Sequence, residues 1–562
     1  MRRNTLPVGK VLLLVPSNFP LVSNLGRGFF DKPGERYILG RMQARNYMNI
    51  PVSAGRLNPL QVRATLAIWG LVCITALQSL LFSSSVAIAA EQDQFTVREL
   101  SVEGWNLGSL FGDFNGDGLS DVAIIYIPTK IRDQRRFLGL FVQDKSTGFK
   151  SAPTSVFPFP TGASCFQATD LDSDGKDEIV FLDDNGVQTL NPIGADASSS
   201  RRIVRRKTIY QLTDFRGALV SDFALELNGL PGLELVLPVV DGFALFEQGE
   251  DDAYVLLGEI QLKSAGYHAR PERLFFRTNT KTQSYVVETP ELIAADANLD
   301  NNTDLYVLFD NRLYLFLQDR NGDFSSTPDR LLELTELSDG EACYPLLVDC
   351  NGDSRPDVVA LRMKGGIASS ECKVDFYLSD KSGYLSQTPA KTLHLEQARS
   401  SALVADVNGD GKPELVLPAV ELGVVATIKM MMQKKGGFDL LIYDLNNGAP
   451  SDDYSMRKKL PVALDYTAEY PEAGALFNWS ADFNNDGIDD LVYTDGADHL
   501  EIFYGSRTNY MDDDNAIEIT VPEPAQLIPL ELNGDGKMDL IVVRRNSGKI
   551  NGVWTLLNKS SL

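Results

Sequence analysis

The chain repeats one pattern of polar and hydrophobic residues eight times. A nonapeptide rich in acidic and amide side chains, such as "DFNGDGLSD" from Asp113, runs directly into a short apolar stretch, in this copy "DVAII". The later copies begin at residues spaced 57, 56, 70, 53, 57, 76 and 49 apart, which are Asp170, Glu226, Asp296, Asp349, Asp406, Asp482 and Glu531. Because short β-branched runs bounded by turn residues are typical of buried strands, each copy predicts a turn followed by a strand.

The rest of each unit predicts further strands. A turn such as "DDNG" from Asp183 leads to a third apolar run, for which "FALFEQ" and "LEIFYG" are examples. A second recurrent turn, such as "DKSTGF" from Asp144, then leads to a more polar strand. Four strands in each repeated unit predict the blades of a β-propeller, so we expect an all-β, eight-bladed β-propeller of four-stranded blades.

The two ends of the repeat region predict how the ring closes. After the eighth loop the chain ends without a fourth strand, whereas "QFTVREL" at residues 94–100 is a strand that precedes the first blade. Placing this segment as the outer strand of the last blade leaves no open edge at the seam. Eight blades use every loop, and seven would leave one loop over.

The acidic loops have the composition of a cation site. We number the loops one to eight and their positions one to nine. Oxygen-bearing side chains recur at positions one, three, five and nine, and position six is usually glycine, which allows a positive φ. Such alternating oxygens around a sharp turn can wrap calcium, with a backbone carbonyl near position seven as a further ligand. An EF-hand would need glutamate at position 12, and these loops have residues such as Ile124 and Phe181 there.

Seven loops keep this pattern, and the alternative for each is an acidic turn without metal. Their candidate ligands, with position seven offering its carbonyl, are Asp113, Asn115, Asp117, Leu119, Asp121, Asp170, Asp172, Asp174, Lys176, Glu178, Asp296, Asn298, Asp300, Asn302, Asp304, Asp349, Asn351, Asp353, Arg355, Asp357, Asp406, Asn408, Asp410, Lys412, Glu414, Asp482, Asn484, Asp486, Ile488, Asp490, Glu531, Asn533, Asp535, Lys537 and Asp539. Loop three has Leu230 and Pro231 at positions five and six, so we expect it to hold no metal. Six or seven structural calcium ions are therefore predicted.

Charge separates the N-terminal residues from the repeats. The chain carries −24 in all, whereas residues 1–90 carry +8 and the remainder −32. An acidic surface excludes nucleic acid as a partner, because phosphate binding needs clustered Lys and Arg. Residues 64–90 combine a long apolar run with a small-residue tail, which predicts a cleaved secretory signal or an uncleaved membrane anchor. We expect an N-terminal extension (1–63), this segment (64–90) and an exported propeller (91–562) that is extracellular, at the cell surface or periplasmic.

The repeats resemble the FG-GAP/VCBS family, whose blades are similar to those of integrin α-subunit propellers and of some secreted lectins. The resemblance rests on the D-x-[DN]-x-D-G-x-x-[DE] signature from residue 94 to the end of the chain. It implies calcium loops between the first and second strands and a secreted or cell-surface module for adhesion or carbohydrate binding. Some polysaccharide lyases also resemble eight-bladed calcium propellers, so a lyase-like enzyme is the alternative to a noncatalytic module.

A candidate ligand surface is predicted on the long connections at the face away from the calcium loops. These connections are residues 128–136, 263–290, 362–373 and 421–437, and long loops on a rigid scaffold often carry binding. The basic and aromatic candidates are Arg132, Arg135, Arg136, Tyr267, His268, Arg270, Lys434 and Lys435. They predict an acidic glycan or protein ligand, and ordinary solvated loops are the alternative. Only three histidines supply general acid–base chemistry, which favours binding over catalysis.

The four cysteines that follow residue 90 are too few for a disulfide framework. In an exported protein Cys343 and Cys372 could form one bridge, and buried free thiols are the alternative.

Overall fold

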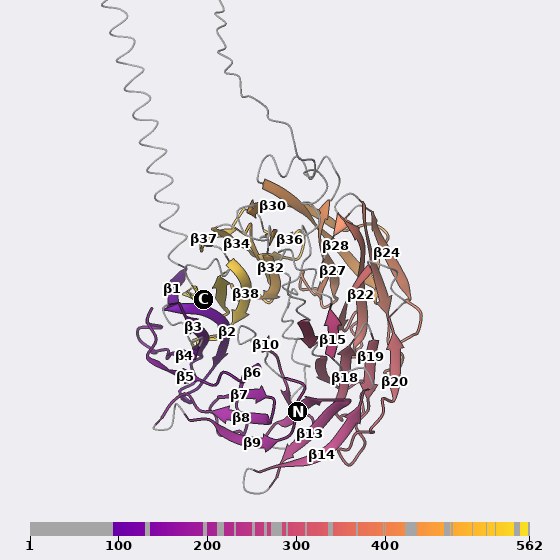
Figure 1. Cartoon of the computed structure of the whole chain (residues 1–562). Helices are drawn as coiled ribbons and strands as arrows, with labels where there is room; N and C mark the ends of the chain where they lie inside the picture. The colour runs from indigo at the N-terminus through magenta and orange to yellow at the C-terminus, as the bar shows by residue number, and fades with distance from the viewer. Residues whose placement is uncertain are drawn as a thin grey trace, which may run out of the picture. The chain divides into compact units, whose positions relative to one another are not determined.

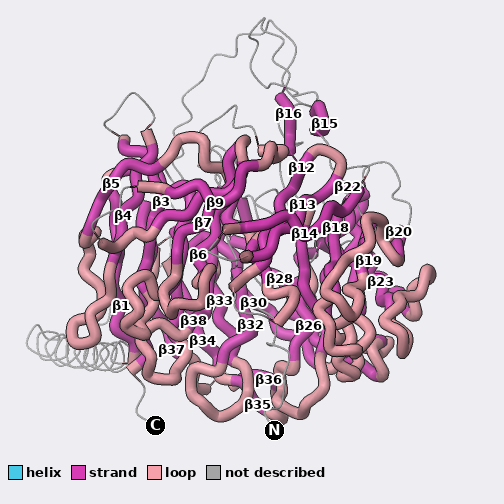
Figure 2. Tube along the Cα trace, turned by 90° about the horizontal axis from the view of Figure 1, so that it is seen from below, coloured by secondary structure: helices cyan, strands magenta, loops and turns pink. Residues whose placement is uncertain are grey.

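The computed structural model describes residues 94–559 except 130–134, 195–198, 211–218, 230–231, 250–252, 263–266, 271–283, 288–289, 310–311, 335–340, 367–368, 397, 400, 422–434, 466–471, 474–475, 497, 513, 523 and 545–550. Every regular element in this part of the chain is a β-strand (Figure 2). It contains no helix with the length and hydropathy to span a bilayer. The predicted N-terminal extension and the apolar segment 64–90 lie outside the described residues.

Eight antiparallel sheets follow one another along the chain and form the blades of a propeller (Figure 1). Blades one to four contain, in turn, β2 (Gly104–Gly112), β3 (Asp121–Pro128), β4 (Arg136–Phe141) and β5 (Ser155–Phe159); β6 (Cys165–Thr169), β7 (Glu178–Asp183), β8 (Gly186–Leu190) and β9 (Arg201–Arg205); β11 (Ala224–Leu225), β12 (Glu234–Val239), β13 (Gly242–Gln248) and β14 (Tyr254–Gln261); β17 (Glu291–Ala295), β18 (Asp304–Phe309), β19 (Arg312–Phe316) and β20 (Arg330–Glu333). Blades five to eight contain β21 (Glu341–Val348), β22 (Asp357–Gly366), β23 (Ser369–Tyr377) and β24 (Lys391–Glu396); β26 (Leu403–Ala405), β27 (Glu414–Glu421), β28 (Lys435–Asn446) and β30 (Met456–Asp465); β32 (Leu476–Ala481), β33 (Asp490–Thr494), β34 (His499–Phe503) and β37 (Ile517–Thr520); β38 (Pro524–Leu530), β39 (Asp539–Arg544), β40 (Asn551–Asn558) and β1 (Phe95–Val102).

Short accessory strands extend some blades. β10 (Leu219–Val220) adds to β6 in parallel, and β25 (Ala398–Arg399), β29 (Ala449–Pro450) and β31 (Glu472–Ala473) extend blade six. Two separate hairpins are formed by β15 (Tyr267–Arg270) with β16 (Ser284–Val287) and by β35 (Gly505–Ser506) with β36 (Tyr510–Met511).

The predicted repeat unit is confirmed strand by strand. In all eight blades the second strand begins at position nine of the acidic loop, that is at Asp121, Glu178, Glu234, Asp304, Asp357, Glu414, Asp490 and Asp539. β3 is buried from Asp121 to Ile127, because a central propeller strand is covered on both sides by neighbouring blades. This double burial explains why these strands are continuous apolar runs with no alternation.

The predicted closure of the ring is also confirmed. β1 pairs with β40 in antiparallel register from Phe95 opposite Asn558 to Val102 opposite Asn551. Blade eight therefore combines three strands from the C-terminal end of the chain with one from the N-terminal end. The pairing removes the exposed strand edge that an open array would present.

The hydrophobic core is divided among the contacts between blades. The described residues contain eight buried clusters, and each joins two successive blades. One of them joins Leu100 of blade eight to Ile124 of blade one and so completes the circuit. The fold is consequently held by eight similar interfaces.

The strand order gives the propeller two distinct faces. The acidic loops join first to second strands, and turns such as Asp144–Gly148 join third to fourth strands, so antiparallel pairing puts both on one face, which we call the loop face. Connections from second to third strands and between blades lie on the opposite face. In Figure 2 the β15–β16 hairpin lies at one edge of the propeller and β35–β36 at the other, in agreement with this division.

The suggested bridge between Cys343 and Cys372 is wrong. Cys343 lies on β21 and Cys372 on β23, and β22 runs between these two strands. Two strand spacings separate the residues by about 10 Å, which is beyond the reach of a disulfide. Cys165, Cys343, Cys350 and Cys372 are free thiols, and burial raises the pKa of Cys372 to about 12.

The seam contact between blades eight and one predicts a stability effect. Leu100 on β1 is fully buried, so Leu100→Ala should lower the free energy of unfolding by about 2–5 kcal/mol, measured by urea denaturation of the full chain. The matched change Leu256→Ala on β14, where the side chain is 51% exposed, should have a much smaller effect. Equal effects of the two substitutions would contradict a closed seam.

Candidate functional site

Each acidic loop is organised around the carboxylate at position one. In loop one, Asp113 Oδ1 accepts hydrogen bonds from the amides of Gly116 at 2.7 Å and Asp117 at 3.1 Å, and Oδ2 accepts from Gly118 at 2.7 Å. The bond from position six to position one recurs at 2.7–2.9 Å in loops two, four, five, six and seven. These bonds curl the backbone so that the alternating side chains converge.

Two residues of each complete loop have positive φ, of which the sequence indicated one. Position six has φ of 82° at Gly118, and Asn301 and Ser354 take the same conformation without glycine, at 67° and 68°. Position four also has positive φ in all eight loops, from 58° at Leu299 to 78° at Gly116. The signal for this second turn was the glycine at position four in five of the eight copies.

The side chains at positions one, three and five lie close enough to share an ion. In loop two one carboxylate oxygen from each of Asp170, Asp172 and Asp174 lies within 4.8 Å of the other two. In loop one Asn115 Nδ2 donates to Asp117 Oδ2 at 3.0 Å, which leaves the amide oxygen of Asn115 to accept from the Asp117 backbone. Oxygen-only donors at this spacing fit calcium.

The carboxylate at position nine is buried at the start of the second strand. Asp121, Asp304, Asp357, Asp490 and Asp539 are 0% exposed. In loop seven, Asp490 Oδ2 accepts from the position-two amide of Phe483 at 2.7 Å, and Oδ1 accepts from Gly505 just beyond the third strand at 2.7 Å. In loop one, Asp121 Oδ2 is buried and has no hydrogen-bond partner, so it is an acceptor that a cation could satisfy.

Burial of these carboxylates shifts their protonation. Burial raises the pKa of Asp121, Asp490 and Asp539 to about 7, and the neighbouring loop carboxylates raise it further. The same causes raise the pKa of Glu414 to about 8 and that of Asp304 to about 6. Without a cation, these carboxylates of the folded protein therefore bind protons at a higher pH than free carboxylates do.

Neighbouring loops are hydrogen-bonded to one another. The Asp113 amide donates to Asp177 Oδ2 in loop two at 2.7 Å, and the Asp177 amide donates back to the Asp113 carbonyl at 2.8 Å. Across the seam, the Ser120 amide donates to the Leu532 carbonyl of loop eight at 2.9 Å. An ion that orders one loop would therefore also support the loop of the next blade.

Loop three has fewer candidate ligands than the others. Glu226 Oε1 accepts from Gly229, and Asn228 Nδ2 donates to Glu234 Oε1 at 2.6 Å, so its first and last thirds resemble the complete loops. Leu230 and Pro231 at positions five and six lie outside the described residues. The expectation that this loop holds no metal stays a prediction.

The predicted basic surface is only partly within the described residues. Arg132 and Lys434 lie outside them, Tyr267, His268 and Arg270 lie on β15, and Lys435 is the first residue of β28. Arg135 is exposed on the opposite face, before β4. The prediction is wrong for Arg136, because its side chain is 0% exposed and Nη1 donates to the Ala163 carbonyl at 2.5 Å.

The stretch 362–373 does not form a long loop. Most of it continues β22 and β23, and only 367–368 separates the two strands. Its register is regular from Arg362 opposite Lys373 to Gly366 opposite Ser369, so the repeat is lengthened there without an insertion.

A cleft on the loop face was not predicted from the sequence. It has a volume of about 480 Å³ and lies between blades two and three. Its lining combines hydroxyl, amide, acidic, basic and apolar side chains, namely Leu171, Asp172, Glu178, Thr189, Asn191, Ile193, Ser199, Ser200, Arg201, Ile203, Gln248 and Tyr254. The sequence gives no signal for it, because the residues come from loop two, the β8–β9 connection and five strands of two blades, which only the packing of the blades brings together.

Comparison with known proteins agrees with the repeats. The model of the FG-GAP-like repeat matches residues 113–181, 296–360 and 349–417, which include loops one, two, four, five and six. No curated protein matches the chain.

Several solved structures are similar to this chain at low identity. A lectin from Agrocybe aegerita that recognises non-reducing terminal N-acetylglucosamine is 12% identical, with 76% of this chain and 90% of that chain covered and a TM-score of 0.35. The V. cholerae biofilm matrix protein Bap1 is 14% identical, with 83% and 91% covered and a TM-score of 0.37. The Dos1 propeller is 10% identical, with 82% and 95% covered and a TM-score of 0.41. Likenesses of this strength say nothing about what this chain binds.

The buried position-nine carboxylates predict a pH dependence of the metal-free protein. In the folded state the pKa values of Asp304, Asp121 and Glu414 are about 6, about 7 and about 8, whereas unfolded carboxyls titrate near 4. The folded state then binds more protons between these values, so the free energy of unfolding should fall as pH rises from about 5 to about 8.

Calcium should oppose this loss, because it binds the deprotonated carboxylates. The difference in melting temperature between calcium-loaded protein and protein stripped of metal by chelation and gel filtration should therefore widen with pH. Circular dichroism melts at several pH values measure it. A difference that is zero, or that does not change with pH, would contradict calcium binding by these loops.

Variants of single loops test how many calcium ions the chain binds. Asp406→Ala removes the position-one ligand of loop six, so this variant should bind one calcium fewer than the wild-type chain. Glu226→Ala makes the matching change in loop three and should leave the count unchanged. Elemental analysis after dialysis against calcium measures both, and a loss in the second variant would show that loop three also holds an ion.

Proposed function

Because the chain is an eight-bladed propeller that carries FG-GAP-like repeats, we propose that it is an exported, noncatalytic binding module that is stabilised by calcium. Its ligand is a hydroxyl-rich molecule of the glycan class, bound in the cleft between blades two and three. The single observation that carries this proposal is that cleft, whose volume of about 480 Å³ suits a small saccharide.

The lining of the cleft suits a sugar better than an apolar ligand. Thr189, Asn191, Ser199 and Gln248 offer neutral donors and acceptors for hydroxyl groups. Ile193, Ile203 and the ring of Tyr254 offer apolar surface for the C–H face of a sugar ring. Arg201 adds a charged donor that would favour an acidic saccharide.

Calcium has a structural role in this proposal. The alternating side chains of each loop, with the carbonyl at position seven, would supply the ligands, and the ion would neutralise carboxylates that otherwise repel one another. Asp172 and Glu178 belong both to loop two and to the cleft wall. Calcium in loop two would therefore hold one wall of the cleft in place, so ligand binding should depend on calcium.

The contents of the cleft support binding rather than catalysis. No histidine or lysine is among its lining residues, and the two carboxylates in it are candidate calcium ligands. The Tyr254 hydroxyl donates to the Leu233 carbonyl at 3.1 Å, and burial raises its pKa, so it is a poor general base. Burial raises the pKa of Glu178 to about 7, which would suit a general acid or base, but calcium bound in loop two would occupy this carboxylate and so leave it unavailable to a lyase.

Export is part of the same proposal and rests on residues 64–90, which predict a signal or an anchor. A glycan or a protein that displays one would then be met outside the cytoplasm, nucleic acid would not be a partner, and a membrane would be contacted only through an uncleaved N-terminal segment.

Filling the cleft should abolish ligand binding. Ser199→Trp places an indole at the cleft lining, so binding to a glycan array should fall at least about tenfold, the equivalent of about 1.4 kcal/mol. Ser382→Trp is the matched control, because Ser382 is an exposed serine in a turn of blade five on the same face. Both variants are tested in calcium and after chelation.

The charge-reversed pair Arg135→Glu and Lys435→Glu tests the opposite face. If this pair loses binding and Ser199→Trp retains it, the ligand belongs to the basic connections and the cleft proposal is overturned. Retention of binding by all variants would exclude both surfaces.

A further inference from the structure

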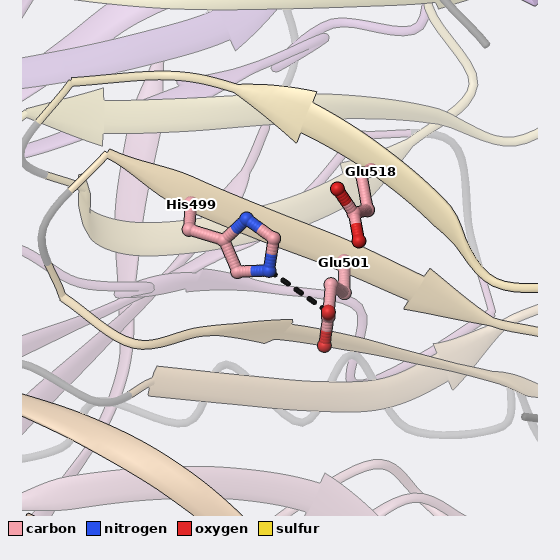
Figure 3. Close-up of side chains that lie close together, drawn as sticks. All are labelled: His499, Glu501 and Glu518. Atoms are coloured by element: carbon pink, nitrogen blue, oxygen red, sulfur yellow. Dashed lines mark hydrogen bonds and ion pairs between the residues drawn. The ribbon is translucent and has the colours of Figure 1, made fainter. Parts of the chain in front are cut away.

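Blade seven carries a mixed imidazole and carboxylate cluster on its outer strands. His499 and Glu501 are two residues apart on β34, so their side chains project from the same side of the sheet. Glu518 on β37 is directly opposite Glu501 in the antiparallel register. Figure 3 shows the three side chains together on one side of the two strands.

The three side chains lie close enough for one ligand atom of each to contact a single ion. His499 Nε2 lies 2.8 Å from Glu501 Oε1, and one ligand atom from each of the three residues lies within 4.8 Å of the other two. The His499 side chain is 35% exposed and that of Glu501 is 20% exposed, while Glu518 is exposed. An ion could therefore enter from solvent without any opening of the blade.

The cluster holds two carboxylates for one imidazole. Two glutamates directly opposite each other on paired strands repel, and such pairs normally destabilise a sheet. A divalent cation among the three side chains would remove this repulsion.

The strand β34, which carries His499 and Glu501, is anchored by buried residues of blades six and seven. Tyr493 pairs with Glu501 across β33 and β34, and its hydroxyl donates to the Pro461 carbonyl of blade six. Tyr493 and Phe503 are both buried in the cluster that joins blades six and seven. The strand β34, which carries His499 and Glu501, is thus held by its pairing with β33 and by the packing between blades six and seven. This support preorganises the site.

We propose that His499, Glu501 and Glu518 form a binding site for a divalent transition metal of the zinc class. Imidazole and carboxylate together suit zinc, whereas calcium prefers oxygen ligands alone, so this site and the acidic loops select different ions. Three protein ligands leave one position of a tetrahedral ion open to water or to an anionic group of a ligand. When it binds, the metal replaces the proton between Nε2 and Oε1 and links the third and fourth strands of blade seven.

The test is a zinc titration of the full chain by calorimetry, in a large excess of calcium that keeps the acidic loops occupied. We expect the wild-type chain to bind one zinc ion. The affinity for zinc should be at least about tenfold lower in His499→Ala and in Glu518→Gln. His394→Ala is the matched control, because His394 also lies on an outer strand, opposite Lys373 on β23, and it should bind zinc like the wild type.

Cobalt gives a second measurement. A tetrahedral cobalt site absorbs in the visible range, so the spectrum should appear in the wild type and in His394→Ala and be absent in His499→Ala. Circular dichroism of each variant shows whether it is folded. Zinc binding that is equally tight in His499→Ala, or no zinc bound by the wild-type chain, would overturn the proposal. The outcome is independent of the cleft between blades two and three.

Discussion

The carboxylate at position nine, which is buried in every loop except loop two, is the interaction on which the rest of the structure depends. It is the last residue of the acidic turn and the first residue of the central strand, so it belongs to the loop face and to the core at once. Asp539 shows the arrangement, since Oδ2 accepts from the Leu532 amide in its own loop and Oδ1 accepts from the amide of Asn558, the last residue of the third strand. Asn558 Nδ2 then donates to the Phe483 carbonyl of loop seven. One carboxylate thus connects the turn, the blade and the preceding blade, and its burial is costly unless charge or protons compensate it.

Much of this fold was readable from the sequence because the same local rule operates eight times. The acidic turn and the apolar run from Asp121 predicted the strands of a blade, and their eight copies predicted the number of blades. The extra strand at Phe95 predicted the closure of the ring at the seam. The positive φ at Ser173 and Leu299 was not readable, because neither residue type favours it and only the hydrogen bonds to position one impose it.

The candidate sites show where sequence reasoning ends. Loop ligands lie within nine residues of one another, so spacing alone places them together. The cleft requires β8 and β9 to pack beside β13 and β14, and the outer-strand cluster requires the register that puts Glu518 opposite Glu501. Arg136 was wrongly predicted to be part of the exposed basic surface for the same reason. A basic residue at the end of a polar stretch is expected to be exposed, and the sequence does not show that its guanidinium donates to the Ala163 carbonyl.

The pairing of β1 with β40 also affects how the chain folds during its synthesis. β1 is synthesised well before β40, so it cannot complete blade eight until the chain has been made through Asn558. Until then, β1 and the newest blade each present an edge to which other chains can pair. The wide separation of β1 and β40 in the sequence therefore exposes the growing chain to aggregation until the ring closes.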